Sequence, residues 1–176
     1  MTVDEFIPWA MAHPRGRWEL IDGEPRRMSP ERARHRKVKG AIFLALRLAV
    51  ERAGVACVVE PDGATVRIDE HRSYEPDALV YEGPELPEDS IEVPNPLIVV
   101  EVLSPGSETL DTCAKFRGYF SLPTLAHYLI VDPDERTIVH QARAPDGRIV
   151  STAVTEGLLA LDPRALELAV SDMLPD

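Results

Sequence analysis

The sequence predicts an α/β protein, a mixed β-sheet flanked by helices with a β-ribbon near its N-terminus. Three observations lead to this prediction. First, one long amphipathic helix precedes four strand-like segments rich in Val and Ile. Second, another helix comes after these four segments. Third, further strand-like segments come after the second helix. The chain has 176 residues, enough for one domain with a substantial core, so we expect a single domain over residues 1–176.

The N-terminal ribbon is predicted for residues 18–28, because the chain alternates around Asp22-Gly23, a dipeptide that favours a tight hairpin turn. Ser29 and Pro30 then predict the start of a helix, as its cap and its first residue. This helix should end at Gly54, and its apolar residues recur at helical spacing: Val38, Ala41, Ile42, Ala45, Leu46 and Ala49.

His35 lies three positions before Val38, on the same apolar stripe of the long helix, whereas Arg32, Arg36 and Lys39 are expected on its flanks. Proline-rich acidic residues 82–96 predict a loop. Strands are predicted for residues 55–60, 64–68, 74–81, 97–103, 127–131, 137–141 and 149–154, and a second helix for residues 109–120.

Composition narrows the class of protein. The hydrophobic share is 44% and no apolar run approaches the ~18 residues of a membrane span, so no membrane partner is expected. Residues 1–5 lack the pattern of a signal peptide, which makes the cytoplasm the expected location. Cys57 and Cys113 lack metal-ligand spacing and are expected as small core residues rather than a disulfide.

The charge is strongly uneven. The formal net charge of −11 argues against a general nucleic-acid coat protein. Residues 15–39, however, contain nine Lys and Arg and only four Asp and Glu. Arg32, Arg36 and Lys39 on the long helix are the candidate nucleic-acid contacts of this basic segment. The alternative is a solvated helix face.

One acid, Glu101, interrupts the otherwise apolar strand of residues 97–103. A buried carboxylate is costly unless it meets a cation, a hydrogen-bond network or a metal. Two groups are predicted to meet it: Asp77, which follows the strand-breaking Pro76, and Lys115 on the second helix. Two converging carboxylates repel unless a cation lies between them, and Mg²⁺ takes oxygen ligands. Acid, acid and lysine suit metal-assisted phosphodiester hydrolysis.

Several short motifs follow one another in a fixed order. They are Glu19-Leu-Ile-Asp-Gly-Glu24, Met28-Ser-Pro30, His35, Pro76-Asp77, Val99-Val-Glu-Val-Leu-Ser-Pro105, Asp111, Lys115, Tyr119 and Tyr128-Leu-Ile-Val-Asp-Pro133. In this order the chain resembles the Uma-two family of bacterial endonucleases, within the PD-(D/E)XK restriction-endonuclease-like superfamily. The resemblance implies that fold, hydrolysis of DNA phosphodiester bonds with Mg²⁺ or Mn²⁺, and a homodimer.

The superfamily motif, carried onto this chain, implies that Asp77 and Glu101 bind the metal together with the backbone carbonyl of Val102. Position 103 departs from the motif, since Leu103 stands where the superfamily usually has lysine. Relatives that resemble this chain place the lysine on the following helix, which makes Lys115 the candidate. It would position or help deprotonate the attacking water and offset charge on the phosphate.

Three further residues have implied supporting roles. His35 stands where many superfamily members carry an acid on the first helix, and it could orient a water at the metal. Glu19 is a candidate for the same outer role. Asp111, four residues before Lys115, would hold the lysine stem.

Each of these residues also has a structural alternative. Asp77 could cap the turn after Pro76, His35 could be a packing residue, and Lys115 with Asp111 could form a surface ion pair worth ~0.3–0.5 kcal/mol. For the whole protein, one alternative is a catalytically idle nucleic-acid-binding module on the same fold. The other is a protein-interaction module whose acidic surface mimics DNA.

Overall fold

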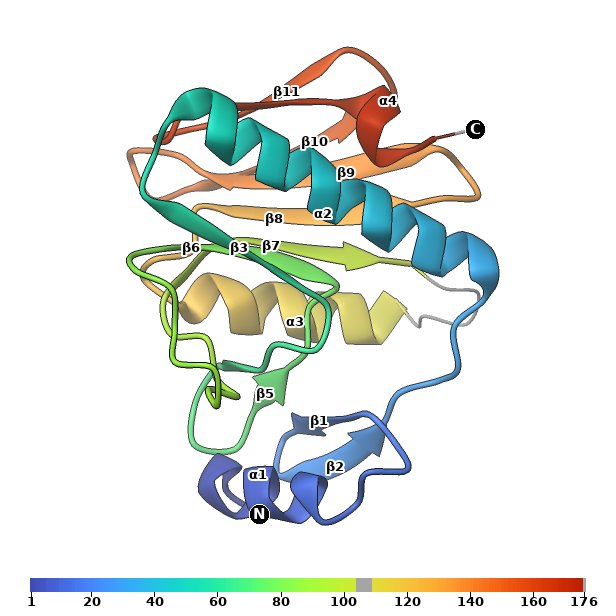
Figure 1. Cartoon of the computed structure of the whole chain (residues 1–176), viewed down its shortest axis with the longest axis vertical. Coiled ribbons are helices and arrows are strands. Elements are labelled where there is room, and N and C mark those ends of the chain that lie inside the picture. The colour runs from blue at the N-terminus through green and yellow to red at the C-terminus, as the bar shows by residue number, and fades with distance from the viewer. Residues whose placement is uncertain (104–108, 176) are drawn as a thin grey trace.

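A computed structural model describes residues 1–103 and 109–175, with only the backbone for residues 109–112. It confirms the predicted mixed sheet flanked by helices (Figure 1). The main sheet has six strands in the order β10 (Ile149–Val154), β9 (Thr137–Arg143), β8 (His127–Asp132), β7 (Pro96–Val102), β6 (Ala78–Glu82) and β3 (Cys57–Pro61). Strands β7 and β8 are parallel, and the other neighbours are antiparallel.

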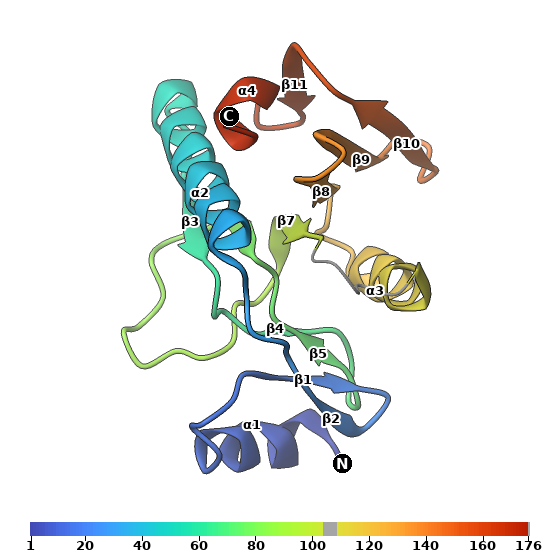
Figure 2. The same cartoon turned by 90° about the vertical axis from the view of Figure 1, so that its right-hand side faces the viewer.

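Helices cover both faces of this sheet (Figure 2). One face is covered by α2 (Ala33–Ala53) and by the C-terminal elements β11 (Leu158–Leu161), β12 (Leu166–Ala169) and α4 (Val170–Met173). The other face is covered by α3 (Thr109–Ser121) and by the short strands β4 (Val66–Arg67) and β5 (Ser73–Tyr74). No helix in the described ranges is long and apolar enough to cross a membrane.

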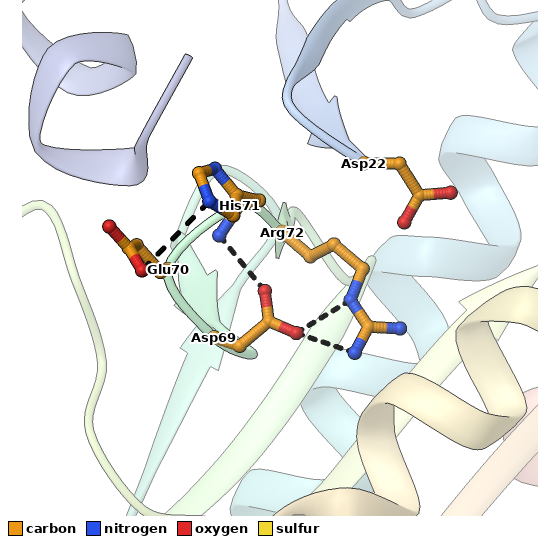
Figure 3. Close-up of a pocket in the computed structure, with 5 residues that line it drawn as sticks. All are labelled: Asp22, Asp69, Glu70, His71 and Arg72. Carbon is orange, nitrogen blue, oxygen red and sulfur yellow. Dashed lines mark hydrogen bonds and ion pairs between the residues drawn. The ribbon is translucent and has the colours of Figure 1, made fainter.

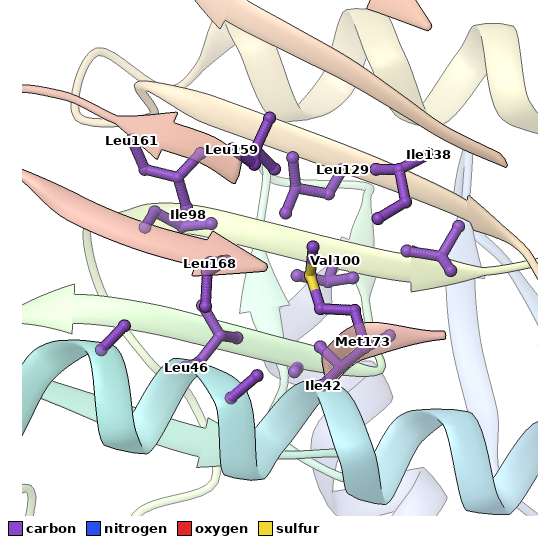
Figure 4. Packing of buried hydrophobic residues seen from close by; sticks show 14 of the residues in the cluster. Ile42, Leu46, Ile98, Val100, Leu129, Ile138, Leu159, Leu161, Leu168 and Met173 are labelled. Carbon is purple, nitrogen blue, oxygen red and sulfur yellow. The ribbon is translucent and has the colours of Figure 1, made fainter. Parts of the chain in front are cut away.

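The alternation of β7 divides its side chains between two hydrophobic clusters. Ile98, Val100 and Val102 join the cluster under α2, whereas Val99 joins the cluster on the α3 side. Figure 4 shows the first cluster, in which Ile42, Leu46, Val100, Leu129, Leu168 and Met173 lie together.

The predicted N-terminal ribbon is confirmed as β1 (Trp18–Ile21) and β2 (Glu24–Arg27). Asp22 and Gly23 both have positive φ, at 50° and 81°, as a two-residue hairpin turn of this hand requires. The ribbon joins β5 and β4 in a separate four-stranded sheet. Helix α1 (Val3–Met11), which was not predicted, packs on this layer and begins with a capping box of Thr2 and Glu5.

Two predictions about the elements and one about a cysteine were wrong. Helix α2 begins at Ala33 with Arg32 as its N-cap, not at Ser29-Pro30, although Gly54 ends it in the left-handed region as expected. Residues 74–81 are not one strand, because the chain breaks between β5 and β6 at the segment that contains Pro76. Both cysteines are free as predicted, but Cys113 is exposed rather than part of the core.

Candidate active site

The two predicted acids lie at neighbouring ends of strands β6 and β7. Ala78 of β6 pairs with Val100 of β7, and Asp77, the residue before Ala78, also contacts Val100, next to Glu101 in the sequence. Backbone and side-chain bonds fix Asp77 there: its N–H donates to the Val100 carbonyl at 2.9 Å, and the Val102 N–H donates to its Oδ2 at 2.6 Å. Pro76 therefore marks a break before a central strand, not a sheet edge.

Lys115 of α3 meets Glu101 directly. Its Nζ lies 3.0 Å and 3.1 Å from the two Glu101 carboxylate oxygens and 2.8 Å from Glu19 Oε1. The Tyr119 hydroxyl donates to Glu101 Oε1 at 2.8 Å, and the Glu75 N–H donates to Glu19 Oε1 at 2.9 Å. The trio of Glu19, Glu101 and Lys115 is thus assembled from a ribbon strand, a core strand and a helix.

Burial governs the electrostatics of this trio. Burial raises the pKa of Glu101 to about 7; Lys115 opposes that rise, and the other carboxylates nearby add to it. Burial alone would lower the pKa of Lys115, but Glu101 and Glu19 overcome it and raise that pKa well above the ordinary lysine value. Lys115 is therefore a permanent ammonium at neutral pH, not a proton acceptor.

The other side of Asp77 faces helix α2. Lys39 Nζ lies 2.6 Å from Asp77 Oδ1, with only 7% and 6% of the two side chains exposed. Lys39 also bonds Asp62 Oδ2 at 2.7 Å and Glu31 Oε1. His35 Nε2 lies 3.9 Å from Asp77 Oδ2. The expectation that Lys39 lies on an exposed flank was wrong.

Arg17 extends this network toward the N-terminal layer. Its guanidinium bonds Asp62 Oδ2 at 2.7 Å and Glu75 Oε2 at 3.0 Å, and it lies 3.5 Å from Glu31 Oε1. Burial alone would raise the pKa of Asp62, but Lys39 and Arg17 reverse this and hold it below the ordinary value. Asp62 is therefore an anion at neutral pH.

The donor set fits a divalent cation by charge. Across the described part of the site, the carboxylates of Glu19, Glu31, Asp62, Glu75, Asp77 and Glu101 face the cations of Arg17, Lys39 and Lys115. Carboxylates outnumber cations two to one, and oxygen ligands suit Mg²⁺ and Mn²⁺. An incoming ion must compete with ammonium groups, because Lys39 and Lys115 already bond Asp77 and Glu101.

The structure places most predicted site residues in one cluster. Asp77, Val102, Glu101, Lys115, Glu19 and His35 come together, whereas Arg32 and Arg36 are exposed at the beginning of α2. The side chain of Asp111 lies outside the described residues. Lys39 was not predicted as part of the catalytic cluster, although it follows His35 by four positions and so continues the buried stripe.

A shallow polar hollow elsewhere on the surface does not belong to this site. It is lined by Asp69, Glu70, His71 and Arg72, with Asp22 of the hairpin turn facing them (Figure 3). Arg72 is already paired with Asp69 at 2.5 Å. None of the clustered acids lines this hollow.

Comparison with known proteins agrees with this fold. The chain is similar to a crystal structure of “a putative nuclease belonging to DUF820” from Anabaena variabilis ATCC 29413, with a TM-score of 0.73 and 19% identity over 98% of this chain and 97% of that one. No curated protein matches. A family model, Uma2, described as “Putative restriction endonuclease”, matches residues 3–173. The chain therefore belongs to the Uma2 family.

Proposed function

We propose that this protein hydrolyses phosphodiester bonds in DNA, with Mg²⁺ or Mn²⁺ held by Asp77, Glu101 and the backbone carbonyl of Val102. The observation that carries the proposal is the contact of Lys115 Nζ with both Glu101 oxygens, at 3.0 Å and 3.1 Å. It pairs the second acid of the motif with a lysine although Leu103 stands at the position where the motif usually has its lysine.

A bound ion would supply a Lewis acid that lowers the pKa of water and offsets phosphate charge. Lys115, whose pKa is raised by Glu101 and Glu19 despite burial, contributes a fixed positive charge beside the scissile phosphate. We therefore assign it the electrostatic role and not the base role. Glu19 and Tyr119 position it, the first by bonding its ammonium and the second by bonding Glu101.

The test is Mn²⁺-dependent nicking of supercoiled DNA by wild type and by Asp77→Asn, Glu101→Gln and Lys115→Met. All three variants should lose activity, and the first two should also lose Mg²⁺ binding measured by calorimetry. Asp146→Asn, which removes an acid from the exposed pair with Arg148, is the matched control and should stay active. Nicking that survives in Glu101→Gln would overturn the proposal.

DNA should reach the site over the start of α2, where Arg32, Arg36 and Lys37 are exposed. Replacing these three residues with Gln should weaken duplex binding and lower the slope of log K against log salt by about 0.9 for each phosphate that is no longer neutralised. Fluorescence anisotropy at several salt concentrations measures the slope. An unchanged slope would mean that this face is only solvated.

A second candidate is a catalytically idle binding module on the same fold. Two observations favour it: the protein's own lysines already neutralise Asp77 and Glu101, and the net charge is −11. DNA or basic-protein binding that is unaffected by Mn²⁺, without nicking, would support it. We also propose a homodimer, which fits two-fold DNA symmetry, and light scattering in solution tests it.

A further inference from the structure

Three potential ligands meet on the α2 side of Asp77, away from Glu101. Donor atoms of Glu31, His35 and Asp77 all lie within 4.8 Å of one another. Glu31 lies in the segment that precedes Arg32, the N-cap of α2, and His35 lies in the first turn of that helix, so the beginning of α2 brings the two side chains together. Asp77 joins them from the start of β6. Small movements of these side chains would bring three ligands around one ion.

His35 gives independent evidence that this cluster accepts a ligand. The residue is only 8% exposed, and its Nδ1 is buried without a hydrogen-bond partner in the described structure. Its Nε2 lies 3.9 Å from Asp77 Oδ2, too far for a hydrogen bond. The ring therefore makes no hydrogen bond in the described structure, and its Nε2, the nitrogen near Asp77, is available to a metal ion.

The local charge is also that of a site for a dication. Glu31, Asp62, Glu75 and Asp77 here face two cations, Lys39 and Arg17. The two excess negative charges equal the charge of one divalent ion. Lys39, which touches Glu31, Asp62 and Asp77, occupies part of the space as an internal competitor.

We propose that Glu31, His35 and Asp77 form a separate transition-metal site, selective for Co²⁺, Mn²⁺ or Zn²⁺ over Mg²⁺ because one of its ligands is an imidazole. The site shares Asp77 with the proposed catalytic site and omits Glu101. The proposal of this metal site is independent of the proposal that the protein hydrolyses DNA. Binding of the ion loosens the contact between Lys39 and Asp77.

The experiment is a titration of the full-length protein with Co²⁺, followed by visible absorbance and calorimetry. Glu31→Gln and His35→Asn should each weaken Co²⁺ binding by more than about tenfold. Asp62→Asn, which removes the same charge from the same cluster but no proposed ligand, should keep the Co²⁺ absorbance spectrum. Lys39→Met should tighten Co²⁺ binding, because the competing ammonium is gone.

Separate outcomes distinguish this site from the proposed function. Glu101→Gln should abolish Mg²⁺-supported nicking yet retain the Co²⁺ spectrum. Equal Co²⁺ affinity in wild type, Glu31→Gln and His35→Asn would overturn the proposed metal site. It would not contradict the proposed nuclease function. Circular dichroism confirms that each variant is folded. If a variant is unfolded, the ring-nitrogen NMR signals of His35 in the wild type, which should shift or broaden with Co²⁺, give the deciding measurement.

Discussion

Lys115→Met should strongly destabilise the protein at neutral pH. The side chains of Lys115, Glu19 and Glu101 are only 9%, 8% and 14% exposed, so losing the ammonium leaves two buried carboxylates without their cation. Removing one partner of a buried ion pair costs about 3–5 kcal/mol in the free energy of unfolding. For a chain of this length that corresponds to a fall in Tm of roughly 6–20 °C, measurable by circular dichroism.

The loss should be smaller at pH 5 than at pH 8, because burial already raises the pKa of Glu101 to about 7 and protonation removes its charge. The double variant Lys115→Met/Glu101→Gln should recover part of the stability at pH 8. Arg148→Met is the control: its pair with Asp146 is 83% and 50% exposed, and its loss should cost less than about 1 kcal/mol. If Lys115→Met costs no more than this control, burial does not strengthen the pair as we infer.

Two further predictions concern other parts of the fold. Gly118→Ala should cost about 1–3 kcal/mol in urea unfolding, because the new Cβ would lie 2.7 Å from a ring carbon of the buried Tyr74, whereas Gly40→Ala, with nothing within 4 Å, should be neutral or stabilising. His140 packs beside His127, and burial lowers the pKa of His140 in the folded protein to about 4. As the pH falls, His140 is therefore protonated in the unfolded chain before it is protonated in the folded protein. The stability present above about pH 6.5 is lost as the pH falls toward 4. In a pH series of melting curves, His140→Gln should lose less stability over this range, and equal losses would contradict the assignment.

Local patterns were enough to predict the strands of the main sheet and the need of Glu101 for a buried partner, and the family resemblance then pointed to Lys115. The run of residues 97–103 has one acid among apolar residues, and such a residue requires a buried partner wherever the strand lies. The Asp22-Gly23 turn likewise specified its hairpin without tertiary information. These features depend on period and backbone chemistry, which a sequence displays directly.

The remaining parts depended on long-range packing. Lys39 was expected on a flank of the long helix, yet the carboxylates of Glu31, Asp62 and Asp77 stabilise it inside. Arg17 and Asp62 come together from loops that carry no periodicity. Helix α1 did carry a signal, the capping box of Thr2 and Glu5, and the Leu-rich alternation of residues 158–169 marked the C-terminal hairpin.

The bond between Glu19 and Lys115 joins residues 96 positions apart in the sequence, and this separation determines when the bond can form during synthesis and folding. During synthesis, Glu19 and Glu101 emerge before the helix that carries Lys115. A nascent or truncated chain therefore holds two acids without the cation that pairs with both in the fold, and their burial is costly. Contacts between residues so far apart in the sequence slow folding, because a long loop must close before they form. The trio of Glu19, Glu101 and Lys115 is consequently complete only when the N-terminal ribbon and α3 have both docked on the sheet.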